Sequence, residues 1–489
     1  MSGFGDRIGA ALRLPARRGR RVAVVVTIVL LAVVAGIGVT VLRATVLVNR
    51  VAATVPPPPP VLPRLALRPA AVEGPAPTRA GVSAVLDPLV AAGGLGTVSG
   101  QVIDPATGTV LWQRDPAAAL VPGSTAKLLT ASAALLTLDH QERFHTTVLA
   151  GAEPGTVVLV GGGDPTLSGA VPGAATGYPD AARLDDLVSQ VRAAAPGPVR
   201  HVLVDVSRYT GDALAPGWFP ADVAGGDIAP IEPVMLDGGR ADPVQEISPR
   251  AAKPASAAAA ELARRLGADP DTVSVGTALP GAAVLGEVSS PPVQDLVATA
   301  LQRSDNVLAE ALAREVARAT GAQASFSGAS EAVLTVLRRH GFDVDGATLV
   351  DGSGLSVDDA VPAMLLTELL GAAATPDKSD ADKSNAVNSN TDGAHQQRTA
   401  ALRPLLVGLP VAGGSGTLAD RYHGPTASGR GWVRAKTGTL TGVNSLAGTV
   451  LDTEGGVLVF ALLSNGPNPV SVRPRLDALA AGLRSCGCH

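Results

Sequence analysis

A serine and a lysine stand three residues apart in the segment Ser124-Thr-Ala-Lys127, a spacing that suits nucleophilic catalysis. On a helix, residues three positions apart lie on one face, so the lysine amine can reach the serine hydroxyl. Serine needs a base to lose its proton, and lysine serves as that base when burial or a second cation lowers its pKa. By itself the pattern is also explained by Ser124 as a helix N-cap, with Lys127 in solvent.

Ser304, Asp305 and Asn306 form a second group of polar residues, between two predicted helices. In a cleft, the Ser304 hydroxyl could pass a proton while the Asn306 amide holds an amide of the substrate. The alternative interpretation is that these side chains cap the second helix.

A third segment, Lys436-Thr437-Gly438-Thr439, falls on a predicted strand. The glycine would let the backbone of a ligand lie close to the strand, and a solvated strand end is the alternative. Lysine is rare in this chain, which has only Lys127, Lys253, Lys378, Lys383 and Lys436. Two of the five lysines belong to the candidate segments, which argues against coincidence.

These segments need helices and strands to position them, and the hydrophobic pattern predicts both. Helices are expected at 124–138, 256–266, 306–320, 330–340 and 470–483, with another ending near 302, and strands at 98–104, 110–113, 157–160, 199–206, 432–436, 442–451 and 456–464. Ser124 then begins a helix, Ser304 lies in an interhelical loop, and Lys436 lies on a strand.

The same pattern divides the chain into parts. Short strands, Gly/Pro turns and brief helices at 146–290 predict an inserted domain, which separates a first part at 81–145 from a second part at 291–489. Residues 375–398 carry almost no apolar side chains, so they are predicted to be a disordered insert.

The N-terminus predicts a membrane anchor. Residues 22–42 form an uncharged apolar run of 21 residues, close to the roughly 20 that cross a bilayer. Arginines in the preceding basic segment, 1–21, place the N-terminus in the cytoplasm and the remainder outside, beyond a Pro-rich linker at 43–80. A cleaved signal peptide is the alternative, although its apolar stretch is usually shorter, about 7 to 15 residues.

Composition excludes several classes of protein. The hydrophobic fraction of 46% and charged fraction of 17% exclude wholesale disorder, and the net charge of −4 gives no basic surface for nucleic acid. The two cysteines, Cys486 and Cys488, lie in the C-terminal tail, where they cannot build a disulfide framework. We expect neither a metal nor an organic cofactor.

Together the three segments are the set found in penicillin-binding proteins and class A β-lactamases. The chain resembles the D-alanyl-D-alanine carboxypeptidase/endopeptidase group of low-molecular-mass, class C penicillin-binding proteins over roughly 81–483. Segments that resemble its blocks are Pro122-Gly-Ser-Thr-Ala-Lys127, Gly161-Gly-Gly-Asp-Pro165, Asp351-Gly-Ser-Gly-Leu-Ser356, Gly414-Ser-Gly-Thr417 and Lys436-Thr-Gly-Thr439. About 180 residues separate Ser124 from Ser304, and this gap is similar to that of the peptidases and longer than in single-domain β-lactamases.

The resemblance implies an α+β transpeptidase-like domain, with an antiparallel sheet flanked by helices and interrupted by a β-rich inserted domain. It also implies that Ser124 attacks the carbonyl of the penultimate D-alanine, with Lys127 as general base and Ser304 passing the proton to the leaving D-alanine. The backbone N–H groups of Ser124 and Thr439 would form the oxyanion hole.

For substrate binding, the resemblance implies that Lys436 and Thr437 hold the terminal carboxylate and that Asn306 binds the peptide. Asp164 would receive the amino group of the third residue of the stem peptide, with a turn-forming Asp-Pro as the alternative. The family often carries arginine where this chain has Val357, which weakens the case for recognition of a side-chain carboxylate there.

The implied function is a serine-type D-Ala-D-Ala carboxypeptidase, with endopeptidase activity left open, that acts on peptidoglycan stem peptides and is acylated by penicillins. One alternative is a β-lactamase, but no Glu-x-x-Leu-Asn segment lies between Ser124 and Ser304 to position a hydrolytic water. The other is a non-catalytic cell-wall-binding protein with the same fold.

Overall fold

The computed structural model describes residues 77–376, 389–466 and 468–486. A five-stranded antiparallel sheet joins segments from the two ends of the chain, in the order β10-β11-β12-β1-β2. These strands are β1 (Thr97–Ile103), β2 (Val110–Arg114), β10 (Val433–Leu440), β11 (Val443–Leu451) and β12 (Val457–Asn465). Because β1 pairs with β12, segments more than 300 residues apart in sequence lie side by side.

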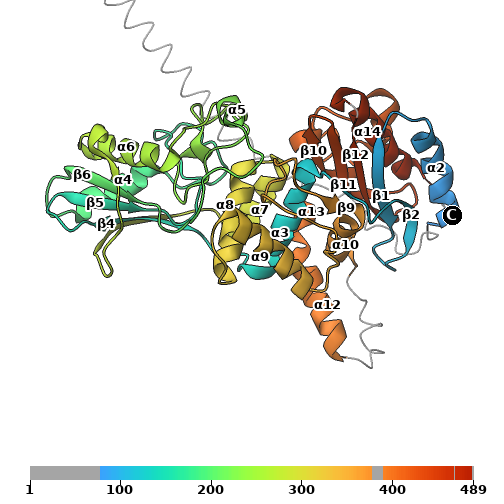
Figure 1. Cartoon of the computed structure of the whole chain (residues 1–489), viewed down its shortest axis with the longest axis horizontal. Coiled ribbons are helices and arrows are strands. Elements are labelled where there is room, and N and C mark those ends of the chain that lie inside the picture. The colour runs from blue at the N-terminus through green and yellow to red at the C-terminus, as the bar shows by residue number, and fades with distance from the viewer. Residues whose placement is uncertain (1–76, 377–388, 467, 487–489) are drawn as a thin grey trace, which may run out of the picture. The chain divides into compact units, whose positions relative to one another are not determined.

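Helices cover both faces of this sheet (Figure 1). On β12, Val459, Ala461 and Leu463 point into one core, while Phe460 and Leu462 point into the other, as strand alternation requires. The second core is closed by α2 (Arg79–Ala91) and α14 (Pro469–Ser485). The first is closed by α3 (Lys127–Thr137), α7 (Val293–Gln302), α8 (Asn306–Ala319), α9 (Phe326–Arg339), α10 (Ala363–Ala374) and α13 (Pro404–Gly408).

A second sheet lies in the region between α3 and α7, in the order β7-β6-β5-β4-β8 (Figure 1). Its strands are β4 (His145–Ala150), β5 (Thr156–Val160), β6 (His201–Asp205), β7 (Ser274–Val275) and β8 (Val284–Ser289). The β5–β6 and β6–β7 pairs are parallel, and the pairs that involve β4 are antiparallel.

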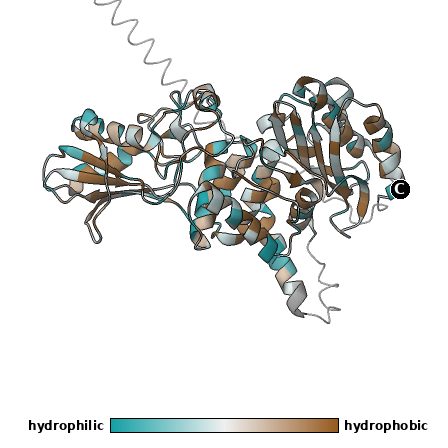
Figure 2. Cartoon of the chain, viewed as in Figure 1, coloured by the Kyte–Doolittle hydropathy of each residue, from teal (hydrophilic) through white to brown (hydrophobic). Residues whose placement is uncertain are grey.

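The expectation that this region is β-rich fits its five-stranded sheet but is incomplete, because helices make up much of the rest. Its core is shared between strands and two amphipathic helices, α4 (Leu184–Ala194) and α6 (Pro254–Leu266), which bury Leu187, Val191 and Leu262. Parallel neighbours in a sheet need a crossover connection, and α4 lies within the connection from β5 to β6. Figure 2 shows apolar residues along these strands, and the buried ones form one core cluster with those of α4 and α6.

The prediction that residues 375–398 are disordered is wrong at the C-terminal end of that range. Helix α12 (Ser389–Leu402) begins inside it, whereas residues 377–388 lie outside the described part. Contacts with other elements favour order here, because the Arg398 guanidinium lies 5.1 Å from the Phe342 ring and donates to the carbonyl of His340, and Leu402 is fully buried. The local composition carries no sign of these contacts.

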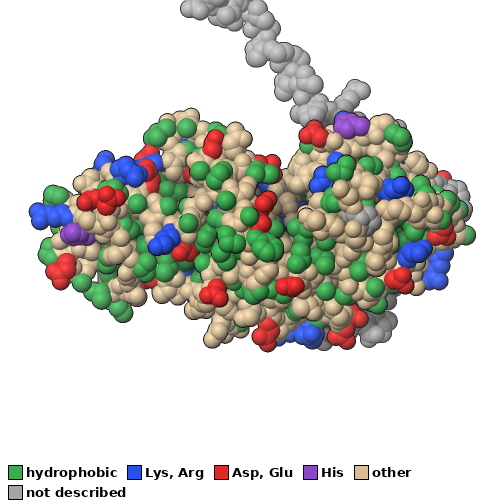
Figure 3. Space-filling view, turned by 45° about the horizontal axis from the view of Figure 1, so that its top comes forward, with side chains coloured by type: hydrophobic (Ala, Val, Ile, Leu, Met, Phe, Trp, Pro, Cys, Tyr) green, Lys and Arg blue, Asp and Glu red, His purple; other side chains and the backbone are tan. Residues whose placement is uncertain are grey.

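The predicted membrane anchor, 22–42, and most of the predicted linker, 43–80, lie outside the described residues. Within the part of the chain that is described, no helix is both long and apolar enough to cross a bilayer. On the face seen in Figure 3, basic and acidic side chains are interspersed rather than gathered by sign.

Candidate active site

Ser124 and Lys127 lie at the junction of a short 3-10 turn, Gly123–Ala126, and helix α3. The Lys127 Nζ is 2.9 Å from the Ser124 Oγ. Lys127 is 1% exposed, and no side-chain cap precedes either helical segment. The alternative of a capping serine beside a solvated lysine is therefore wrong.

Lys127 sits among three acceptors. Besides the Ser124 hydroxyl, its Nζ lies 2.5 Å from the Asn306 Oδ1 and 2.8 Å from the Ser353 carbonyl. Burial lowers the pKa of Lys127 to about 8, although the neighbouring carboxyl groups of Asp351, Glu310, Asp305 and Asp359 oppose that shift. A substantial neutral fraction of this amine is therefore available near pH 8, and a neutral amine can accept the serine proton.

Ser304 occupies the tight turn between α7 and α8 with a positive φ of 56°. The Lys436 Nζ donates to the Ser304 Oγ at 2.9 Å and to the Thr437 carbonyl at 2.9 Å. Lys436 is completely buried, and burial together with the nearby charge of Lys127 holds the pKa of Lys436 well below its ordinary value. The structure thus links the second and third candidate segments through this lysine.

The capping interpretation of the second segment is right for its middle residue. Asp305 is the N-cap of α8, and its Oδ1 accepts from the Leu308 N–H at 2.9 Å. Its neighbour Asn306 instead directs its amide oxygen at Lys127 and donates from its Nδ2 to the Asp227 carbonyl at 2.9 Å. One residue therefore stabilises the helix while those on either side face the site.

Gly438 is required by the protein's own backbone. A Cβ at this position would collide with the Pro122 carbonyl and the Ser445 Oγ, and would lie 3.0 Å from the Ser124 nitrogen. The expectation that this glycine makes room for a ligand therefore needs correction, because the turn that carries Ser124 fills the space.

The backbone N–H of Thr439 points off the free edge of the sheet. Strand β10 is the edge strand, and the Ala435 N–H donates to the Pro410 carbonyl, away from β11. Because alternate residues of a strand share this direction, the Thr439 N–H faces the same side. A Cβ added to Gly123 would lie 3.2 Å from the Thr439 nitrogen, so this nitrogen lies beside the turn that carries Ser124.

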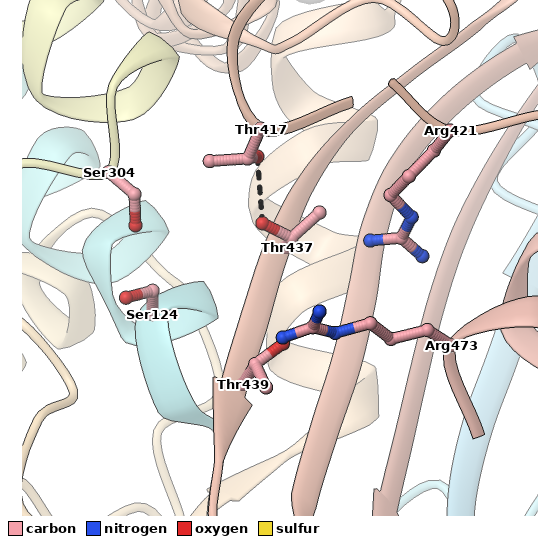
Figure 4. Close-up of a pocket in the computed structure, with 7 residues that line it drawn as sticks. All are labelled: Ser124, Ser304, Thr417, Arg421, Thr437, Thr439 and Arg473. Carbon is pink, nitrogen blue, oxygen red and sulfur yellow. Dashed lines mark hydrogen bonds between the residues drawn. The ribbon is translucent and has the colours of Figure 1, made fainter. Parts of the chain in front are cut away.

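A pocket of about 250 Å3 opens where these elements meet. It is lined by Ser124, Ser304, Thr417, Arg421, Thr437, Thr439 and Arg473 (Figure 4). The Thr417 and Thr437 hydroxyl oxygens are 2.8 Å apart. Lys127, Asn306 and Lys436 do not line the pocket. The two lysines bond to the serines that do, and Asn306 bonds to Lys127.

Three lining residues were missed as site residues by sequence reasoning. Thr417 belongs to a block quoted for the family resemblance, so a signal for it existed. Arg421 and Arg473 carry none, because arginine is common in this chain and neither lies in a recognisable motif. Their place in the pocket follows only from the packing of α14 and the 416–421 region beside β10.

The structure does not bring Asp164 into the pocket. This residue is 1% exposed, and its Oδ1 accepts from both the Thr166 N–H and the Thr166 hydroxyl. Burial raises the pKa of the Asp164 carboxyl to about 6. The turn-forming alternative therefore describes Asp164 better. Val357, where the family often carries arginine, is half exposed.

The loop 351–356 supplies one of the hydrogen-bond acceptors of the Lys127 amine. The buried Asp351 carboxylate accepts from the backbone N–H groups of Ser353, Gly354 and Ser356, and from the Trp218 indole. This turn presents the Ser353 carbonyl to the Lys127 amine. Nearby, both Glu310 oxygens accept from the Gly352 N–H at 3.0 Å, and burial raises the pKa of Glu310 to about 8.

The Ser124 hydroxyl is hydrogen-bonded to a buried amine and lies on a helical turn beside the edge strand of an antiparallel sheet. This arrangement defines a class of serine hydrolases that work through an acyl-enzyme. Within that class, residues 82–246, 240–401 and 392–484 match the D-Ala-D-Ala carboxypeptidase 3 (S13) family. The chain belongs to this family.

Curated proteins similar to this chain are named carboxypeptidases. The chain is 46% identical over 480 residues to carboxypeptidase DacB of Mycolicibacterium smegmatis, covering 97% of this chain and 99% of that one. It is also 46% identical over 448 residues to a carboxypeptidase of Mycobacterium tuberculosis, covering 90% and 91%.

Among solved structures, penicillin binding protein 4 of Haemophilus influenzae superposes with a TM-score of 0.64 at 20% identity, over 82% of this chain and 98% of that one. A second structure of that protein, with a TM-score of 0.56, is a complex with a β-lactam. At this identity the likeness establishes the penicillin-binding-protein fold.

Proposed function

We propose that this chain is a serine D-Ala-D-Ala carboxypeptidase that acts on peptidoglycan stem peptides through an acyl-enzyme on Ser124. The observation that carries the proposal is the hydrogen bond of 2.9 Å between the Ser124 hydroxyl and the buried amine of Lys127. Burial lowers the pKa of this amine to about 8, so it can act as a base near neutral pH. Membership of the S13 family supports the same substrate class.

In acylation, the neutral Lys127 amine takes the proton of the Ser124 hydroxyl while the Oγ attacks the carbonyl carbon of the penultimate D-alanine. The oxyanion that forms is stabilised by the backbone N–H groups of Ser124 and Thr439, which lie beside one another. Each such donor contributes about 10² to 10³ in rate in a comparable hydrolase.

The proton then moves to the leaving nitrogen as the carbon–nitrogen bond breaks. Ser304 lines the pocket, and its hydroxyl accepts a hydrogen bond from Lys436, so it can relay the proton towards the departing amine. D-Alanine leaves with its amine, and the peptide remains esterified to Ser124. A water molecule, deprotonated by Lys127, attacks this ester. The bond from the acyl carbon to the Ser124 Oγ breaks, the shortened peptide leaves with a new carboxyl group, and Lys127 returns the proton to the serine.

The same attack on the strained amide of a penicillin would leave a stable adduct, and we propose that β-lactams acylate Ser124. Support comes from the fold shared with penicillin binding protein 4, a structure of which holds a β-lactam. The location of the catalytic part outside the cytoplasmic membrane, with residues 22–42 as its anchor, stays a prediction.

Two measurements test the function. The purified protein should release D-alanine from a soluble peptide that ends in D-Ala-D-Ala. A reporter penicillin should acylate it once, so that the intact mass of the protein rises by the mass of one penicillin. Ser124→Ala should abolish both, because it removes the nucleophile and leaves the fold intact. Rapid, sustained hydrolysis of the penicillin would favour a β-lactamase, and neither release nor adduct would favour the non-catalytic alternative.

A further inference from the structure

The pocket has to accommodate a carboxylate, because the residue that leaves D-Ala-D-Ala carries one. Lys436 was expected to supply the positive charge, but it does not line the pocket. It is fully buried, and its two hydrogen bonds go to the neutral Ser304 hydroxyl and Thr437 carbonyl. Among the residues that line the pocket, the cationic ones are Arg421 and Arg473.

Arg421 is a poor candidate, because its charge is already balanced. Its guanidinium donates through Nε and one terminal nitrogen to the two oxygens of Asp477, at 3.1 and 2.7 Å. The side chains of this pair are only 17% and 7% exposed. A bidentate, largely buried pair of this kind offers little net charge to a ligand.

Arg473 is the cation that remains. It lies on α14, lines the pocket with the Thr437 and Thr439 side chains, and has no hydrogen bond or ion pair to any of the described residues. Figure 4 shows its side chain extending from α14 towards Thr439. Asp477, one turn further along α14, would be its natural i,i+4 partner, but both oxygens of that carboxylate are bonded to Arg421.

We propose that Arg473 recognises the free carboxylate of the residue that leaves, together with the Thr437 and Thr439 hydroxyls. The inference rests on the proposed function and makes it more specific. A guanidinium binds a carboxylate through two parallel N–H···O bonds, whereas a carboxamide offers one oxygen and no charge. The leaving residue, single or cross-linked, must then carry a free carboxylate, and an amidated one is a poor substrate.

The test compares two soluble peptides that differ only at the C-terminus, one ending in D-Ala-D-Ala and the other in its carboxamide. We expect the parent to prefer the free acid. Arg473→Gln should lower kcat/KM for the free acid by about 10- to 100-fold, the usual value of a charge-assisted hydrogen bond, and change that for the carboxamide less than about twofold.

Two matched variants complete the experiment. Arg475→Gln removes an exposed arginine from the same helix that does not line the pocket, and should keep the parent's preference. Arg473→Lys retains the charge without the planar fork and should recover part of the loss. Complete labelling of each variant by a reporter penicillin after long incubation confirms an intact Ser124 site.

Three results would overturn the inference. If Arg473→Gln kept the parent's preference, another group recognises the carboxylate. An equal loss on both peptides would assign Arg473 a structural role. A parent that hydrolyses neither peptide would instead refute the proposed function, and the inference with it, which separates the two failures.

Discussion

At the scale of single residues, the site depends on two buried lysines whose pKa values are lowered to different extents. Lys127 contacts the nucleophile and keeps four carboxyl groups nearby, so its pKa falls only to about 8. Lys436 is equally buried, and burial and Lys127 both lower its pKa. Contact decides their roles: Lys127 bonds to the Ser124 hydroxyl and suits the role of base, whereas Lys436 bonds to the Ser304 hydroxyl and orients it.

The acylation rate should follow the ionisation of Lys127. The reactive form is the neutral amine, so the rate should rise about tenfold per pH unit below about 8 and level off above it. Stopped-flow measurement of reporter-penicillin acylation between pH 6 and 10 tests this profile. The exposed Lys253 serves as control, since Lys253→Met should keep the parent's profile; a rate independent of pH from 6 to 8 would exclude Lys127 as the base.

At the scale of elements, two short turns align groups that lie far apart in the sequence. The start of α8 is capped by Asp305, which leaves Ser304 and Asn306 free to face the site. The loop 351–356 is folded around the Asp351 carboxylate, which accepts four hydrogen bonds and aims the Ser353 carbonyl at Lys127. These polar contacts help to fix the shape of both turns.

Asp351→Asn should loosen this loop. The amide replaces one acceptor oxygen with a donor, so at least one backbone N–H is left without its acceptor, at a cost of about 1–3 kcal/mol. We expect a lower free energy of unfolding by guanidinium and slower acylation of Ser124. Asp358→Asn changes an exposed neighbour and should alter neither; equal effects of the two substitutions would contradict this account.

At the scale of the whole molecule, the region of the second sheet helps to shape the site. Arg240 forms a buried ion pair with Asp305 at 2.7 Å, and Tyr178 donates to the same carboxylate at 2.8 Å. Against the opposing effect of burial, the charges of Arg240 and Arg250 hold the pKa of Asp305 down to about 2. The region thus contacts the turn that carries Ser304, far from its own core.

Removing this contact should affect both stability and catalysis. Arg240→Gln leaves the Asp305 carboxylate buried without its partner, which typically costs about 3–5 kcal/mol. Tyr178→Phe removes one hydrogen bond and should cost about 1 kcal/mol, so it remains testable if the first variant fails to fold.

Chemical unfolding and the acylation rate are the measurements for both variants. Arg200→Gln, at an exposed arginine of the same region, is the matched control and should behave as the parent. If Tyr178→Phe lost stability but acylated at the parent's rate, the contact would stabilise the fold without positioning Ser304.

The sequence alone identified the three candidate segments, most of the strands and helices, and the family, whose resemblance implied the antiparallel sheet. It could do so because the chemistry of Ser124 and Lys127 needs a spacing set within one helical turn, and because strand and helix periodicities are local properties of the chain. The lysine count helped for the same reason, since a rare residue in a motif is visible without a structure.

Only the tertiary structure decided which side chains reach the pocket. The Asp164 carboxylate bonds within its own turn, and the Lys436 amine bonds to Ser304 without lining the pocket. Arg473 lines the pocket from α14, near the C-terminal end of the chain. Residues 389–402 form a helix because they contact a distant segment. The physical reason is common to all of these: burial, ion pairing and the direction of a long side chain depend on contacts between distant segments, and those contacts exist only after the elements have packed.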